Sequence, residues 1–210
     1  MAETLSAPRA EFDIEDPWSA PAACEPVRLR RSTDASVPRL ATHVAAWYDD
    51  ECLSVLFSCA DDHVEATHVA HDAPLYEEDV VEVFLAPDEL THYYELEVSP
   101  RGTLFDAAVD SPHGDRASMH VDRGWTCEGL AAAVRKVTES DGGITIDTLI
   151  RIPFAGLARR APRKGEIWRA NFFRIDRHPR HGDEYSAWQP TMKTPPDFHV
   201  PRAFGALLFQ

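Results

Sequence analysis

The chain has 210 residues, of which 35 are acidic and 21 basic, so its formal net charge is −14. Such a charge argues against nucleic acid and against an anionic membrane surface as partners, because both carry negative phosphates. No run of about eighteen apolar residues is present, so no membrane span is expected, and the length fits one domain with a sizeable core.

The start of the chain carries no sign of export. Met1 is not followed by a charged segment and an apolar stretch of the kind that directs secretion. We therefore expect a cytoplasmic protein, or one outside the cytoplasm if the sequence is incomplete at its N-terminus. Residues 1–26 are rich in Ala, Pro and acidic side chains without periodicity, which predicts a poorly ordered lead-in before one domain over residues 27–210.

The elements expected along the chain are nearly all β-strands, separated by short polar turns at regular spacing. The strands predicted in chain order are 27–32, 42–48, 52–60, 79–86, 93–99, 102–109, 127–138, 144–152, 164–176 and 203–209, with a turn at 140–143, one short helix within 154–160, and a long loop at 111–124. The pattern indicates an all-β fold, an antiparallel sandwich of the immunoglobulin or jelly-roll type with about ten strands. The four cysteines form no Cys-x-x-Cys pair, so free thiols are expected.

Two of these strands carry a set of carboxylates. Glu82 is the only charged residue within the apolar run 80–86, and Glu95 and Glu97 fall on one face of the alternating run 93–99. Pairing even positions of one strand with odd positions of the other would place all three on one face. Such a row could bind a hydroxyl-bearing ligand, hold a hard cation such as calcium, or lie on a solvated face. Glu82 would be costly to bury without a partner.

A histidine-rich segment, residues 63–71, raises the question of a metal site. Its three histidines are spaced four and three residues apart, as on one helix face, but β-branched neighbours and Pro74 disfavour a helix. Solvated loop histidines are the alternative, and the sequence leaves any metal site unassigned.

Seven segments, taken in this order, resemble carbohydrate-binding module family 9, in particular its stand-alone family 9-like members, which are related to DOMON domains. They span about residue 42 to residue 209 and read AWYDDECLSVLFSCAD, APLYEEDVVEVFLAPD, YYELEVSPRGTLFDA, IRIPFAGL, KGEIWRANFFRID, AWQPT and DFHVPRAFG. The resemblance implies a non-catalytic β-sandwich, associated with glycoside hydrolases and carbohydrate catabolism. It also implies a saccharide ligand bound between two aromatic rings and polar groups, with structural calcium in some members.

The resemblance also assigns residues. Tyr76 stands where the first aromatic, usually Trp, is expected, and Phe198 stands for the second. Glu82 matches an acidic ligand-binding position, and Glu97 falls at a polar position that is Arg in some members. Further recurrent positions are occupied by Asn171, Arg174, Trp188 and His199. We expect both rings to lie on the surface, so that each can be removed with little loss of stability.

Two other functions are compatible with these residues. Two of Glu82, Glu95 and Glu97 could act as the acid and base of a glycoside hydrolase, given one raised pKa and a cleft between them. A DOMON-type electron-transfer module would instead hold haem through axial ligands such as Met119 or Met192 and a histidine, in an apolar slot.

Overall fold

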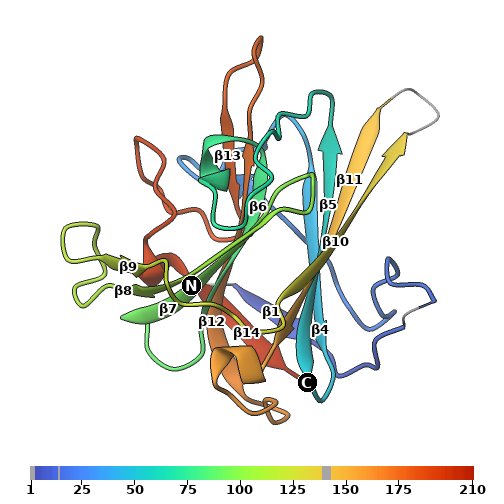
Figure 1. The fold of residues 1–210 in the computed structure, drawn as a ribbon, viewed down its shortest axis with the longest axis vertical. Coiled ribbons are helices and arrows are strands. Elements are labelled where there is room, and N and C mark those ends of the chain that lie inside the picture. Colours follow the sequence, from blue (N-terminus) through green and yellow to red (C-terminus); the bar gives the residue numbers. More distant parts are fainter. Residues whose placement is uncertain (1–2, 14, 139–142) are drawn as a thin grey trace.

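The computed structural model describes residues 3–13, 15–138 and 143–210. The chain folds into two facing β-sheets, which lie side by side in Figure 1 with β5, β10 and β11 to the right. The predicted all-β sandwich is confirmed. Helical structure among the described residues is confined to three single 3₁₀ turns, η1 (Leu75–Glu77), η2 (Ala155–Leu157) and η3 (Pro201–Ala203). The short helix expected within 154–160 is η2.

The larger sheet carries most of the features that follow. Its strands, in spatial order, are β1 (Thr4–Ala7), β14 (Gly205–Phe209), β12 (Ile167–Asp176), β6 (Val80–Ala86), β7 (His92–Val98), β8 (Leu104–Asp110) and β9 (His120–Asp122), with β13 (Glu184–Ala187) also on β12 and β3 (Arg30–Arg31) on β13. All pairs are antiparallel except β1 with β14.

The smaller sheet is built from the predicted hairpins. Its order is β10 (Ala131–Thr138), β11 (Ile144–Pro153), β5 (Cys52–Asp61), β4 (Thr42–Tyr48) and β2 (Val27–Arg28). The expected strand 27–32 is divided, because β2 joins this sheet while β3 joins the larger one. Of the turn predicted at 140–143, residues 140–142 lie outside the described part of the chain.

The N-terminal segment differs from the expectation of a poorly ordered lead-in. Thr4–Ala7 form β1, which pairs in parallel with β14, and the side chains of Leu5 and Ala7 are buried in the core between the sheets. The strand depends on pairing with residues about 200 positions later in the sequence, a contact that local composition does not encode.

Alternation along β6 and β7 sends apolar side chains to both faces of the larger sheet. Val83 and Leu96 face the smaller sheet in the main core, whereas Phe84 and Tyr93 face outward into a second apolar cluster. Loops rather than a third sheet cover this second cluster. Burial on both faces explains why β6 is an almost unbroken apolar run.

All four cysteines are free thiols, as expected. None of the described segments forms a helix long and apolar enough to cross a membrane.

Candidate functional site

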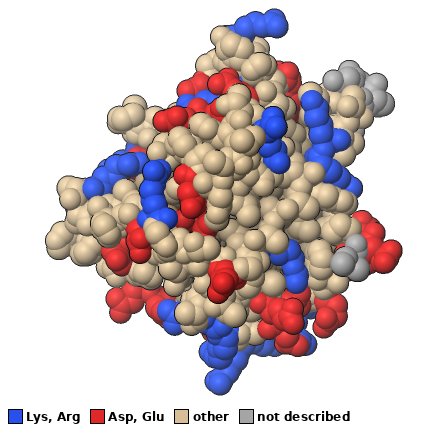
Figure 2. All heavy atoms as spheres, in the orientation of Figure 1, with Lys and Arg blue, Asp and Glu red and all other residues tan. Residues whose placement is uncertain are grey.

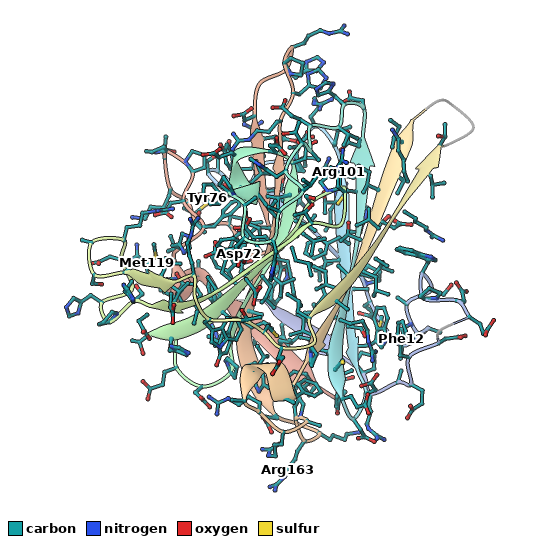
Figure 3. All side chains as sticks on the ribbon, viewed as in Figure 1. Phe12, Asp72, Tyr76, Arg101, Met119 and Arg163 are labelled. Carbon is teal, nitrogen blue, oxygen red and sulfur yellow. The ribbon has the colours of Figure 1, made fainter. Side chains whose placement is uncertain are left out.

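A cavity of about 390 Å³ opens on the outer face of the larger sheet, beside the second apolar cluster. Glu82 of β6, Glu95 of β7 and Phe105 of β8 contribute its floor, and loops before β6, before β9 and before η3 contribute its walls. Tyr76 and Met119, from two of these loops, lie on the same side of the molecule (Figure 3). Acidic and basic side chains are close together on this part of the surface (Figure 2).

Glu82 and Glu95 at the floor meet a third carboxyl group, that of Glu97, which is buried beside them and does not line the cavity; we refer to the three residues as the glutamate triad. Glu82 lies directly opposite Glu97 in the β6–β7 register, and one oxygen from each of the three residues lies within 4.8 Å of the others. Their exposed fractions are 2%, 6% and 0%. Glu95 and Glu97 share a face as predicted, and the observed register, which the sequence left open, adds Glu82 to it. The alternative of a solvated carboxylate row is wrong, because loops cover this face of the sheet.

Burial changes the protonation of the triad. Burial raises the pKa of Glu95 to about 7. It raises the pKa values of Glu82 and Glu97 well above the ordinary range, and the neighbouring carboxylates raise them further. At neutral pH the triad therefore retains protons unless a cation replaces them.

A neutral histidine stands beside the triad. Burial lowers the pKa of His199 to about 4, and burial raises that of Tyr93, so both are uncharged near neutrality. The Tyr93 hydroxyl lies 2.8 Å from His199 Nδ1, and His199 Nε2 lies 3.7 Å from Glu95 Oε1. We assign the phenol as the donor to Nδ1, since the N–H on Nε2 then faces the carboxyl of Glu95.

The structure brings Tyr76 and Phe198 to the same cavity, although they are far apart in the sequence. Tyr76 is 40% exposed, whereas Phe198 is 7% exposed. Phe198 stacks on Phe173 at 4.2 Å between ring centroids and meets Tyr185 edge-on. Tyr76 thus offers an open ring, whereas Phe198 is largely a core residue that reaches the cavity at its margin.

Sequence reasoning missed three arginines that line the cavity. Arg116 pairs with Asp197 at 2.9 Å, and Arg177 pairs with Asp183. Arg123 donates a hydrogen bond to the Tyr76 hydroxyl at 3.1 Å. Arg116 and Arg123 come from the long polar loop predicted at 111–124, so its length was the available signal; nothing in the sequence around Arg177 marked it.

Four residues assigned by resemblance do not line the cavity: Glu97, which is fully buried beside Glu82 and Glu95, and Asn171, Arg174 and Trp188. Asn171 donates to the carbonyl of Gln189 and accepts from its N–H, at 2.8 and 2.9 Å. Trp188 packs in the main core against Phe172. Arg174 points into the space between the sheets, because Phe173, one position before it, is the residue paired with Glu82.

Arg174 belongs to a second group of buried carboxylates, formed by Asp61, Asp79 and Asp176. Its Nη2 lies 2.8 Å from Asp61 and 3.2 Å from Asp176. Asp79 accepts backbone N–H bonds from Glu65 and Arg177, each at 2.6 Å. The cation in this group is thus a side chain of the protein itself.

Two further groups could hold a metal ion by geometry, Asp62–His178–His181 and His71–Asp72–Asp106. Asp62 is paired with Arg39 at 2.6 Å, and Asp106 contacts His71 at 2.8 Å and accepts the backbone N–H of Cys127. Of the histidine-rich segment 63–71, only His71 belongs to such a group. Calcium needs six to eight oxygen ligands, and neither group approaches that number.

The cavity suits neither alternative function well in chemical terms. Hydrolases place their two carboxyls on either side of the scissile bond, whereas Glu82 and Glu95 stand side by side on one floor. Met119 and His199 both line the cavity, but haem requires an apolar slot, and this floor carries carboxyl groups.

Comparison with known proteins agrees with this architecture. A crystal structure of a candidate carbohydrate-binding protein from Bacteroides uniformis has a TM-score of 0.71 at 16% identity, covering 100% of both chains. A family 9 module from Caldicellulosiruptor kristjanssonii in complex with cellotriose gives 0.63 at 14% identity, covering 99% of this chain and 94% of that one. The same organism's module in complex with glucose gives 0.60 at 13%, covering 99% and 96%.

These identities establish similarity of fold alone, and no curated protein sequence matches the chain. The sequence model of carbohydrate-binding family 9, however, matches residues 27–209, which is most of the chain. The chain therefore belongs to carbohydrate-binding family 9.

Proposed function

We propose that the cavity binds a mono- or oligosaccharide and that the protein is a non-catalytic carbohydrate-binding protein with a role in carbohydrate catabolism. The observation that carries the proposal is the meeting of an open aromatic ring, Tyr76, with a floor of carboxyl groups in one cavity. Relatives of the same fold have cellotriose or glucose bound.

The chemistry of the cavity suits a sugar. The apolar C–H face of a pyranose packs on an aromatic ring, and Tyr76 presents such a ring. Hydroxyl groups would donate to Glu82 and Glu95 and accept from Arg123. The cavity volume of about 390 Å³ lies within the usual range of small-molecule sites. With one small open ring, we expect dissociation constants of roughly 0.1–5 mM.

The proposal needs no cofactor. Structural calcium, which the resemblance allows, is a separate proposal that a melting curve with calcium and with EDTA would test. We expect no shift from the group around Asp61, where Arg174 already supplies the positive charge. A cytoplasmic location, proposed from the sequence, would make small oligosaccharides or glycosylated metabolites the available ligands.

Calorimetric titration with common mono- and disaccharides tests the function. Tyr76→Ala should weaken binding about tenfold or more, because it removes the ring on which the sugar packs. Its melting temperature should stay within a few degrees of the wild type, because the side chain is exposed.

Ile167→Ala is the matched control, since Ile167 is 54% exposed and lies outside the cavity lining. It should leave sugar binding unchanged. Binding that survives Tyr76→Ala at full strength, or a protein that binds no sugar of a broad glycan array, would overturn the proposal.

A further inference from the structure

The glutamate triad lacks a positive partner from the protein. No basic side chain in the described part of the chain donates a hydrogen bond to Glu82, Glu95 or Glu97. Both carboxyl oxygens of Glu97 are buried without a hydrogen-bond partner, and the residue is 0% exposed. Burying unpaired carboxylates is costly, so a cation or protons must compensate.

A second group of buried carboxylates, between the two sheets, is compensated in a different way. Asp61 of the smaller sheet and Asp176 of the larger sheet share the guanidinium of Arg174, and Asp79 accepts two backbone N–H bonds. On the outer face, Glu82 and Glu95 line an open cavity. The aspartate group is neutralised by Arg174, a side chain of the protein, whereas Glu82 and Glu95 can be reached from the cavity and could be neutralised by a ligand.

The arginines around the cavity are engaged elsewhere. Arg116 and Arg177 are paired with Asp197 and Asp183. Arg123 is directed to the Tyr76 hydroxyl and lies 5.2 Å above the ring of Phe105. The cavity therefore has a basic rim and an acidic floor, and a ligand with a single positive group would be oriented with that group downward.

The floor suits an ammonium ion better than a metal ion. An ammonium group has three N–H donors, and the floor offers carboxyl oxygens of Glu82 and Glu95, with an oxygen of the buried Glu97 within 4.8 Å of both. Calcium and magnesium require six or more oxygen ligands. The other floor residues, Phe105 and Ile175, have apolar side chains that supply none.

We propose that the ligand is an amino sugar, a saccharide with a primary amine, whose ammonium group binds Glu82 and Glu95 at the floor of the cavity, next to the buried carboxyl group of Glu97. The inference rests on the proposed saccharide-binding function and narrows it. The remaining hydroxyl groups of the sugar then face Tyr76 and the arginines of the rim. An N-acetyl group removes the charge and adds bulk at the floor, so N-acetylated sugars bind weakly.

The test is calorimetry at about pH 7, where the amine is largely charged, on the full chain with matched sets of sugars. Each set comprises the neutral sugar, its 2-amino form and its N-acetylamino form in the gluco, galacto and manno series. In at least one series the amine should bind about tenfold or more tightly than the neutral sugar, as expected for charge-assisted hydrogen bonds. In buffers of different ionisation enthalpy, amine binding should release protons from the triad, whereas neutral sugars should release none.

Glu97→Gln is the diagnostic variant, because it keeps the shape of the side chain but cannot become a carboxylate when the ammonium group binds. It should abolish the preference for the amine and retain binding of the neutral sugar. Glu51→Gln, at an exposed position in the β4–β5 turn, should leave the preference intact. Proton release by the wild type remains a test should Glu97→Gln fail to fold.

Each outcome has a distinct meaning. Equal affinity for amine and neutral sugars in every series would overturn the amino-sugar inference and leave the proposed function standing. A triad that binds calcium chloride alone, and loses it in Glu97→Gln, would overturn the inference in favour of a metal site. Failure of every sugar to bind would overturn the proposed function itself.

Discussion

The two aromatic residues of the cavity differ in how much of each ring is buried against the rest of the protein. Tyr76 contributes little to packing, whereas Phe198 is held against Phe173 and Tyr185 in the second apolar cluster. Removing Phe198 would therefore leave a void under the loop before η3. The expectation that both rings lie on the surface is wrong for Phe198, because its exposed fraction is only 7%.

Phe198→Ala should lower the free energy of unfolding by about 3 kcal/mol, the cost typical of a large-to-small change in a core. Phe198→Leu, which keeps most of the volume, should cost less than half as much. Urea denaturation of both variants, with Tyr76→Ala for comparison, measures the difference. If Phe198→Ala proved as stable as Tyr76→Ala, the ring would be a surface platform after all.

The glutamates show what the alternation of side chains along a strand can predict about a site and what it cannot. Alternation predicts that Glu95 and Glu97 share a face, and the register that adds Glu82 is the one observed. Their burial could not be predicted, because it results from loops such as 111–124, whose path over the sheet depends on tertiary contacts. Arg116 and Arg123 were missed for the same reason.

Strand β12 carries two of the residues assigned by resemblance, and the direction of each side chain determines whether it can reach the cavity. Asn171 and Phe173 pair with Phe84 and Glu82, so odd positions of β12 share the outer face with the triad. Arg174 necessarily faces the smaller sheet. Asn171 is on the correct face, but its amide is engaged by the backbone of Gln189. Similarity of a sequence motif identifies the position of a residue in the strand. The contacts in the folded chain determine whether its side chain is free to bind a ligand.

Strand β1 lies at one edge of the larger sheet and precedes the region matched by the family sequence model, which starts at residue 27. Its side chains are nevertheless part of the main core, and Leu5 is only 2% exposed. Ala206 also donates its N–H to the carbonyl of Glu3 at 2.9 Å. This strand thus closes the edge of the sheet beside β14, which would otherwise present unpaired backbone groups.

Leu5→Ala should lower the free energy of unfolding by about 2–4 kcal/mol, because it creates a cavity in the main core. Ser6→Ala is the neighbouring control, since Ser6 points to the other face and should change stability by less than about 1 kcal/mol. Chemical denaturation of both variants measures the effect. Equal stability of Leu5→Ala and wild type would show that β1 is dispensable for the fold.

At the scale of the whole molecule, the sequence predicted the architecture better than the site. Turns with Gly, Pro and Asp separate runs of alternating side chains, and these local signals suffice for the hairpins of both sheets. Contacts between segments far apart in the sequence could not be predicted from these local signals. The β1–β14 pair and the approach of Tyr76 to Phe198 join residues separated by most of the chain.

The buried ionisable groups also act together on the stability of the molecule. Burial raises the pKa of Asp79 from 3.8 to about 7 and that of Glu95 from 4.5 to about 7, and it raises those of Asp61, Glu82 and Glu97. For each, the folded state binds more protons than the unfolded chain between the two values, so stability falls as pH rises. His199 has the opposite sign, because its pKa falls from 6.5 to about 4, but its contribution is complete above pH 6.5.

The melting temperature should therefore fall between about pH 6.5 and pH 8, where the contribution of His199 is complete and the raised carboxyl pKa values lower the stability. We expect a decrease of about 5 °C, since one kcal/mol corresponds to about 2–4 °C in a domain of this size. Glu97→Gln should flatten the slope, because it removes one titrating group and relieves the repulsion on Glu82 and Glu95. Thermal melts of wild type and variant in matched ionic strength provide the measurement. A melting temperature that rises across this range would show that the triad is compensated in the folded protein by a charge that the chain itself supplies.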